Sequence, residues 1–269
     1  MTVQGEELRF ADPGEAADLA AFLARLIHYD RAAAVRLQAG GGVLAVFGRP
    51  PSFEVLAIRT ARLAADTVLD TTVSAGQFAD ALDTAARRRA GGADAAPPGP
   101  AAAPAGLDVA VPDPVTGPPW AGLLPPRGGW HRVPGLPGAA EVRGAVASAV
   151  AEFRARDAAL PEERRTRAER DRIGREIWSR TLGETGLPLR AVHAAQSLGF
   201  LRPARTPEPV AAAVASGSQG GGSTAPAPEP EQLALLAAGG WLRLRTPYGS
   251  IALRKTGLPG LSGLSVTPA

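Results

Sequence analysis

Arginine is the residue type in this chain with the clearest chemical potential. Seven arginines stand close together and could track the phosphates of a nucleic acid: Arg164, Arg165, Arg167, Arg170, Arg172, Arg175 and Arg180. Acidic residues interleave with them, and pairs such as Asp171–Arg175 and Glu176–Arg180 stand four residues apart, a spacing that stabilises an exposed helix. The row is therefore also what a solvated helix face produces, and both interpretations stay open.

A second basic group lies near the C-terminal end, where Arg243, Arg245, Arg254 and Lys255 flank a predicted turn. A helical stretch before it suggests a winged-helix arrangement, but the prolines of segment 202–210 exclude the recognition helix that should follow. The strands could still touch phosphate through their arginines. The candidate nucleic-acid contacts are therefore Arg164, Arg165, Arg167, Arg243 and Arg245.

Two tryptophans, Trp120 and Trp130, stand in a proline-rich stretch. Rigid aromatic rings give a large contact area at a low entropy cost, so both are candidate partner contacts. The alternative is that they are packing anchors of the core, which we favour.

Catalytic chemistry finds little support in the sequence. The three histidines His28, His131 and His193 fall in different segments without the spacing of a metal site. Glycines 40–42 join two predicted strands and lack the strand-to-helix context of a phosphate loop. Ser74 is better explained as a helix N-cap than as a nucleophile. We expect no catalytic, metal or cofactor-binding residue and no cofactor.

The first 90 residues contain the clearest local signals. Asp12 followed by Pro13 is typical of a helix start, and Ser74 with Gln77 forms a second capping box. Between them, alternating residues around the glycine turn 40–42 predict a hairpin, and two further strand candidates follow. The predicted fold class is α+β, an antiparallel sheet with two helices in the order β-α-β-β-β-β-α, then a helical region and a C-terminal β-hairpin.

Four stretches of residues 5–90 follow one another in the order ELRF, AVRLQAGGGVLAVFG, FEVLAIRTARLA and LDTTVSAGQFADALD. In this order and spacing, residues 5–90 resemble a subdomain of the bacterial sliding clamp, the processivity subunit of the replicative DNA polymerase. The resemblance implies an association with DNA replication, whereas the alternative is a similar order of elements alone. No family is recognised for the rest of the chain.

Low-complexity stretches divide the chain into three segments. We predict an α+β unit over 5–90, a linker over 91–106, an irregular Pro/Trp-rich segment with three helices over 107–206, and a flexible linker over 207–230. Residues 231–269 should form a short helix, ending at Ala238, and a β-hairpin that packs on the preceding domain, because so short a segment rarely folds alone.

Composition narrows the function classes. Of 29 basic residues only Lys255 is lysine, a bias typical of a GC-rich bacterium, and the net charge of +3 is modest despite a pI near 10.1. Residues 140–206 hold 13 arginines against 9 acids, while residues 1–90 hold 10 against 11, so a nucleic-acid surface is expected in the second half.

The chain contains no cysteine and no apolar run long enough to span a membrane, which favours a cytoplasmic location without a membrane partner. We expect a non-enzymatic binding protein associated with DNA metabolism or regulation. Its partner would be DNA or a protein of DNA metabolism, and self-association into a homo-oligomer stays open. The alternatives are a protein–protein interaction adaptor without nucleic-acid contact and an enzyme with an unrecognised site.

Overall fold

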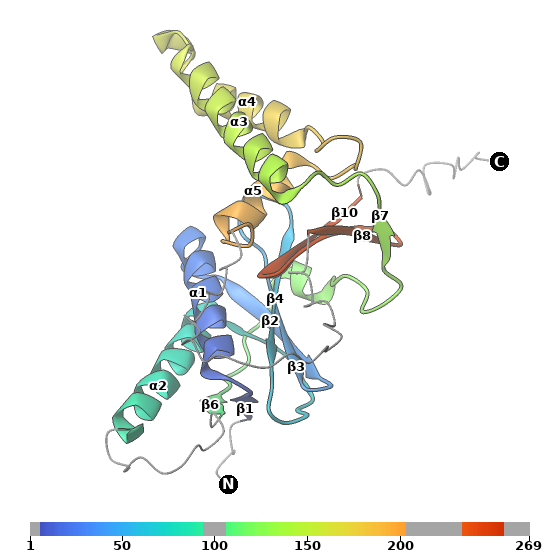
Figure 1. Ribbon diagram of the computed structural model, residues 1–269. Coiled ribbons are helices and arrows are strands. Elements are labelled where there is room, and N and C mark those ends of the chain that lie inside the picture. The colour runs from blue at the N-terminus through green and yellow to red at the C-terminus, as the bar shows by residue number, and fades with distance from the viewer. Residues whose placement is uncertain (1–5, 94–105, 203–232, 256–269) are drawn as a thin grey trace, which may run out of the picture.

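The computed structural model describes residues 6–93, 106–202 and 233–255 (Figure 1). The first half contains β1 (Glu7–Phe10), α1 (Pro13–Tyr29), β2 (Ala34–Gly40), β3 (Val43–Gly48), β4 (Leu56–Arg62), β5 (Leu69–Ser74) and α2 (Ala75–Ala93). This is the predicted order β-α-β-β-β-β-α. The fold class, α+β with antiparallel strands, is confirmed.

Local chemistry sets the boundaries of these elements. The carboxylate of Asp12 accepts a hydrogen bond from the backbone N–H of Gly14 and caps α1, while the hydroxyl oxygen of Ser74 accepts one from Gln77 N at 3.4 Å before α2. Gly41 and Gly42 have φ of 61° and 72°, the left-handed geometry that a two-residue turn between β2 and β3 requires. Both predicted caps and the predicted hairpin are therefore confirmed.

Two strand–helix–strand units interlock in the first half. One consists of β1, α1 and β2, and the other consists of β5, α2 and β6 (Leu107–Ala110). Strand β1 pairs antiparallel with β6, and β2 pairs antiparallel with β5, so the first strand of each unit pairs with the last strand of the other. The helices α1 and α2 pack against each other. The pairing of β1 with β6 thereby holds together the two ends of the first half.

The second half begins with irregular chain and a single 3-10 turn, η1 (Pro119–Gly122), and continues to β7 (His131–Val133). Next come α3 (Ala139–Ala158), η2 (Glu162–Arg164), α4 (Arg167–Ser179) and α5 (Leu189–Ser197), then β8 (Ala234–Ala238), β9 (Trp241–Thr246) and β10 (Gly249–Arg254). The three predicted helices and the β9–β10 hairpin are present. Among the described helices, none is long and apolar enough to cross a membrane.

One predicted element is wrong. The short helix expected at the start of segment 231–269 is a strand over Ala234–Ala238. Its sequence ALLAA has good helix formers, but β8 pairs with β9 on one side and β7 on the other, with Leu235 opposite Leu244. Ladder hydrogen bonds and burial on both faces outweigh intrinsic helix propensity here.

A single eight-stranded sheet joins the two halves, in the order β5-β2-β3-β4-β10-β9-β8-β7. The junction is the antiparallel pair β4–β10, where Ile251 lies opposite Ala57. The C-terminal hairpin therefore contacts α5, as expected of the preceding segment, and also extends the N-terminal sheet. Helix α2 runs to Ala93, into the predicted linker 91–106. The rest of that linker up to residue 105, and the whole predicted linker 207–230, lie outside the described residues.

The main core lies between the sheet and the helices α1, α2 and α5, which cover one face. The rings of Phe22 on α1 and Phe200 after α5 stack at 5.7 Å between centroids. Gly249, at the start of β10, has φ of +151°, and a Cβ there would lie 2.6 Å from the Phe200 ring. Glycine is therefore required where the hairpin passes this buried ring.

The opposite face of the sheet is crossed by residues 111–130, which we call the strap. The backbone N–H of Val115 donates to the carbonyl of Thr72 on β5 at 2.9 Å, and the strap continues to β7 at the other edge. A second, smaller apolar cluster forms beneath it, from strand residues together with Trp120, Leu124 and Trp130. We call this side of the sheet, away from α1, α2 and α5, the open face.

Candidate nucleic-acid interface

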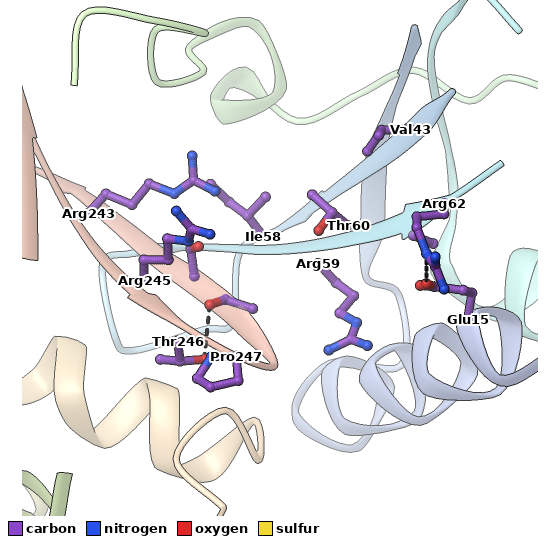
Figure 2. A pocket seen from close by; sticks show the side chains of 13 residues that line it. Glu15, Val43, Ile58, Arg59, Thr60, Arg62, Arg243, Arg245, Thr246 and Pro247 are labelled. Atoms are coloured by element: carbon purple, nitrogen blue, oxygen red, sulfur yellow. Dashed lines mark hydrogen bonds and ion pairs between the residues drawn. The ribbon is translucent and has the colours of Figure 1, made fainter. Parts of the chain in front are cut away.

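The strand register gathers arginines on the open face. Directly paired residues share a face, and so do residues two apart on one strand. Arg132 pairs with Leu236, Leu236 with Arg243, and Arg243 with Ala252, and the other strands extend the same pattern. The register places six arginines at positions of this face: Arg36, Arg62, Arg132, Arg243, Arg245 and Arg254. The side chain of Arg62 turns back toward Glu15 on α1 (Figure 2). The described strands of this sheet contain one acidic residue, Asp70.

Two of these arginines have carboxylate partners. Arg36 Nε lies 2.8 Å from Asp70 Oδ1 on the neighbouring strand β5. Arg62 Nε donates to Glu15 Oε1 on α1 at 2.7 Å, and this contact raises the pKa of the Arg62 guanidinium above its usual value. The charges of Arg36 and Arg62 are therefore largely balanced locally.

Arg243 is the most constrained cation of the group. Its guanidinium lies over the ring of Trp130 at 5.8 Å from the centroid, and its Nε is buried without a hydrogen-bond partner among the described residues. Burial, and secondarily the charge of the nearby Arg245, lower the pKa of Arg243. Two like charges held together at a half-buried position favour an anion between them.

A cavity of about 330 Å³ lies beside this pair, between β4 and the β9–β10 hairpin (Figure 2). Arg243 and Arg245 enter it from β9, with Ile58 and Thr60 on the neighbouring strand β4. Arg59 also contributes to the lining, but its side chain turns toward α1. Arg59 Nη2 donates to Asp18 Oδ2 at 2.7 Å and Nη1 donates to the carbonyl of Tyr248. The charge of Arg59 is therefore used internally, whereas Arg243 and Arg245 line the cavity from β9.

The other three predicted contacts lie elsewhere. Arg164, Arg165 and Arg167 fall at the turn between α3 and α4, two helices that together project from the sheet as an arm (Figure 1). Arg164 pairs with Glu169 at 2.9 Å, and Arg165 donates to the carbonyls of Leu160 and Ala158. The fold does not bring these arginines to the Arg243–Arg245 cavity.

Ion pairs also run along the length of the arm. Arg180 makes two hydrogen bonds to Glu152, at 2.6 and 2.8 Å, and Arg156 makes two to Glu176, at 2.8 and 2.7 Å. The bonds from Arg156 are the main reason that the pKa of Glu176 falls to about 2, and those from Arg180 lower the pKa of Glu152. The interleaved charges of the arm thus stabilise one helix against the other.

The tryptophans of the strap pack on the sheet. Trp120 and Trp130 contact the small cluster on the open face, and both stay partly exposed. Trp130 Nε1 donates to the carbonyl of Pro126 at 2.9 Å, which fixes its ring beside Arg243. Each ring is therefore a packing element that also borders the basic face.

Two of the three histidines, His28 and His193, are engaged in aromatic contacts. His193 on α5 stacks on Trp178 with centroids 4.3 Å apart and meets Phe53 edge-on, and burial lowers its pKa. His28 contacts Tyr29 in a T-shaped arrangement. Within the described ranges, His, Asp and Glu side chains form no group of three that could hold a metal ion.

Three residues of the basic face were missed by sequence reasoning: Arg36, Arg62 and Arg132. Alternation within a strand indicates which residues share a face of that strand, as it does for Arg36 and Gln38. It does not indicate which faces of distant strands coincide. That needed the pairing of β4 with β10 and of β7 with β8, which joins segments far apart in sequence.

The fold and this face define an α+β protein with a basic, arginine-rich sheet surface beside a tryptophan-bearing strap. Residues 3–122 match a domain of unknown function (DUF8010), and residues 125–258 match a second domain of unknown function (DUF8185). Each match spans slightly less than half of the chain, and the boundary between them falls within the strap. No curated protein and no solved structure matches the chain.

Proposed function

We propose that this chain is a non-enzymatic, cytoplasmic binding protein that contacts nucleic-acid phosphates through the open face, centred on Arg243 and Arg245. The observation that carries the proposal is the gathering of six arginine positions on one sheet face, of which Arg36 and Arg62 are paired with Asp70 and Glu15. A surface with an excess of positive charge attracts a polyanion and gains affinity through counterion release.

Two further features favour nucleic acid over other polyanions. Tryptophan rings border the arginines, and aromatic rings on a sheet face can stack on exposed bases. The resemblance of residues 5–90 to a sliding-clamp subdomain points in the same direction. Helices α1 and α2 carry acids and arginines in near balance, so the proposed contact lies on the open face and not on those helices.

The arm has a smaller part in the proposed contact. Arg164 pairs with Glu169, and Arg167 lies 3.8 Å from Asp171, so a phosphate would have to compete with carboxylates of the same arm. Arg243, by contrast, has a buried Nε without a hydrogen-bond partner among the described residues, and it lines the cavity on β9. We therefore expect substitutions on β9 to weaken binding more than substitutions on the arm.

The test is a titration of the full chain against labelled duplex and single-stranded DNA at several salt concentrations. The slope of log affinity against log salt should be about −0.9 per neutralised phosphate for duplex and about −0.7 for a single strand. The double variant Arg243→Gln/Arg245→Gln should flatten the duplex slope by about 1.8, since two contacts are lost. Arg154→Gln, an exposed arginine of α3, is the matched control and should leave the slope unchanged.

Two outcomes would contradict the proposal. One is no binding to either DNA at low salt. The other is an unchanged slope of log affinity against log salt in the double variant Arg243→Gln/Arg245→Gln. The first outcome would favour the second candidate function, a protein–protein adaptor, for which the projecting α3–α4 arm is the supporting observation. Sedimentation of the same chain would then show whether the partner is a second copy.

A further inference from the structure

A second cavity, of about 490 Å³, lies toward the other end of the strands β4 and β10. Its apolar surface comes from Leu56, Trp120, Leu123, Trp241 and Ala252, that is, from the strap and the sheet. The volume is within the range of about 300–1,000 Å³ that small-molecule sites occupy. The cavity combines an aromatic wall with a charged rim.

The rim is strongly basic. Arg49 comes from the β3–β4 loop, Arg190 from α5, and Arg254 and Lys255 from the end of β10, whereas Glu54 is the one acidic residue in the lining. Four cations against one carboxylate leave a formal excess of three positive charges. A single carboxylate ligand would balance only part of this excess, while a phosphate monoester brings up to two negative charges.

Arg190 is the cation with the strongest need of a partner. Its side chain is 21% exposed, and its Nε is buried without a hydrogen bond among the described residues. Glu54 Oε2 lies 3.5 Å from that Nε, within reach of an ion pair but outside hydrogen-bond geometry. The buried Nε of Arg190 is therefore only partly compensated.

Glu54 is poorly placed to keep this contact. Its side chain is 71% exposed, and its backbone has φ of 54°, in the left-handed region that a non-glycine residue adopts at a cost. Ser52, two residues earlier, has φ of 68°. Strained positions of this kind gather at ligand sites. An exposed ion pair is weak, so an anion with better geometry can displace the carboxylate.

We propose that this cavity binds a small aromatic phosphate of nucleotide size, whose phosphate takes the place of Glu54 at Arg190. The aromatic group lies against Trp120 and Leu123, of which Leu123 is 48% exposed, and Arg49, Arg254 and Lys255 balance the remaining charge. This site goes beyond the proposed polymer contact, because it is a separate cavity whose key cation is set back from the surface.

Calorimetric titration of the full chain tests the proposal, with adenosine 5′-monophosphate, adenosine and ribose 5-phosphate as probes. The monophosphate should bind at least about tenfold more tightly than either fragment, since each fragment lacks one half of the recognition. Arg190→Gln should weaken binding of the monophosphate about tenfold or more, because a charge-assisted hydrogen bond is lost. Glu54→Gln should strengthen it about threefold by removing the competing carboxylate.

The control variant is again Arg154→Gln, which should leave the affinity unchanged. Equal binding of adenosine and its monophosphate would overturn the proposal, and so would an unchanged affinity in Arg190→Gln. If Arg190→Gln fails to fold, Glu54→Gln keeps the test decisive, because its side chain is exposed and an affinity that does not rise contradicts the displacement.

The proposed DNA contact and the proposed small-molecule site can be refuted independently of each other. Arg243→Gln/Arg245→Gln should flatten the salt slope with DNA and leave the affinity for the monophosphate unchanged. Arg190→Gln should have the opposite pattern, because Arg190 does not line the cavity of Arg243 and Arg245. If either variant lost both DNA binding and monophosphate binding, the two cavities would act as one site. That result would overturn the proposal of a separate small-molecule site.

Discussion

The ion pair between Asp18 and Arg59 gives the sharpest stability prediction. Asp18 on α1 accepts a hydrogen bond from Arg59 on β4 at 2.7 Å, and Arg59 also donates to the carbonyl of Tyr248 in the β9–β10 turn. The Arg59 side chain is 10% exposed. It therefore ties a helix of the first half to the C-terminal hairpin, beneath the face on which the basic cavity lies.

Asp18→Asn would leave the buried guanidinium of Arg59 without its counter-charge. Removing one member of a fully buried pair costs about 3–5 kcal/mol. Here Asp18 is 42% exposed and Arg59 keeps its carbonyl partner, so we expect about 2 kcal/mol, in the range of about 1.5–3 for hydrogen bonds to charged groups. For a folded region of this size, the melting temperature should fall by about 4–8 °C.

The matched control is Asp83→Asn on α2. Asp83 pairs with Arg87 at 2.6 Å, but both side chains are more than half exposed, so the cost should stay below about 0.5 kcal/mol. Chemical denaturation followed by circular dichroism measures both. Asp18 also lies 3.2 Å from Arg202. The variant Arg202→Gln removes only this exposed contact, so its stability loss can be subtracted from that of Asp18→Asn. Equal losses in Asp18→Asn and Asp83→Asn would refute the reasoning, because burial would then have no effect.

Three further predictions follow from the fold. Removing the cap of α1 by Asp12→Ala, or that of α2 by Ser74→Ala, should each lower the free energy of unfolding by about 1 kcal/mol and leave DNA binding intact; lost binding in Ser74→Ala with normal melting would instead favour the enzyme alternative. Gly249→Ala forces a methyl group into the buried aromatic ring beneath the hairpin and should cost about 2 kcal/mol, whereas Gly122→Ala, with open space around it, should be nearly neutral in the same denaturation experiment. The pKa of Glu176 is about 2 in the folded arm and about 4.3 in an unfolded chain, so its stabilising contribution is complete above the higher value and is lost as the pH falls toward the lower one. Glu176→Gln should therefore flatten the acid side of the stability profile, and an unchanged profile would contradict this account.

The local parts of the fold were predictable because a few adjacent residues decide them. A capping oxygen at Asp12 or Ser74 satisfies an amide two or three residues away, and the glycine pair at 41 and 42 sets its turn by its own backbone geometry. Their outcome depends little on the rest of the chain. The segment Ala234–Ala238 marks the limit of such local prediction. Its sequence permits a helix, but pairing with the neighbouring strands makes it a strand.

The candidate sites could be predicted only in part from the sequence, because they too combine local and long-range features. Arg243 and Arg245 alternate along one strand, so the sequence by itself determined that they share a face, and it determined the elements that surround them. Only the tertiary structure decided that Arg132 joins them, and that Arg190 meets Glu54 across more than a hundred residues. Register between distant strands and the docking of a helix are set by burial of the whole core, a property that no short stretch of residues contains.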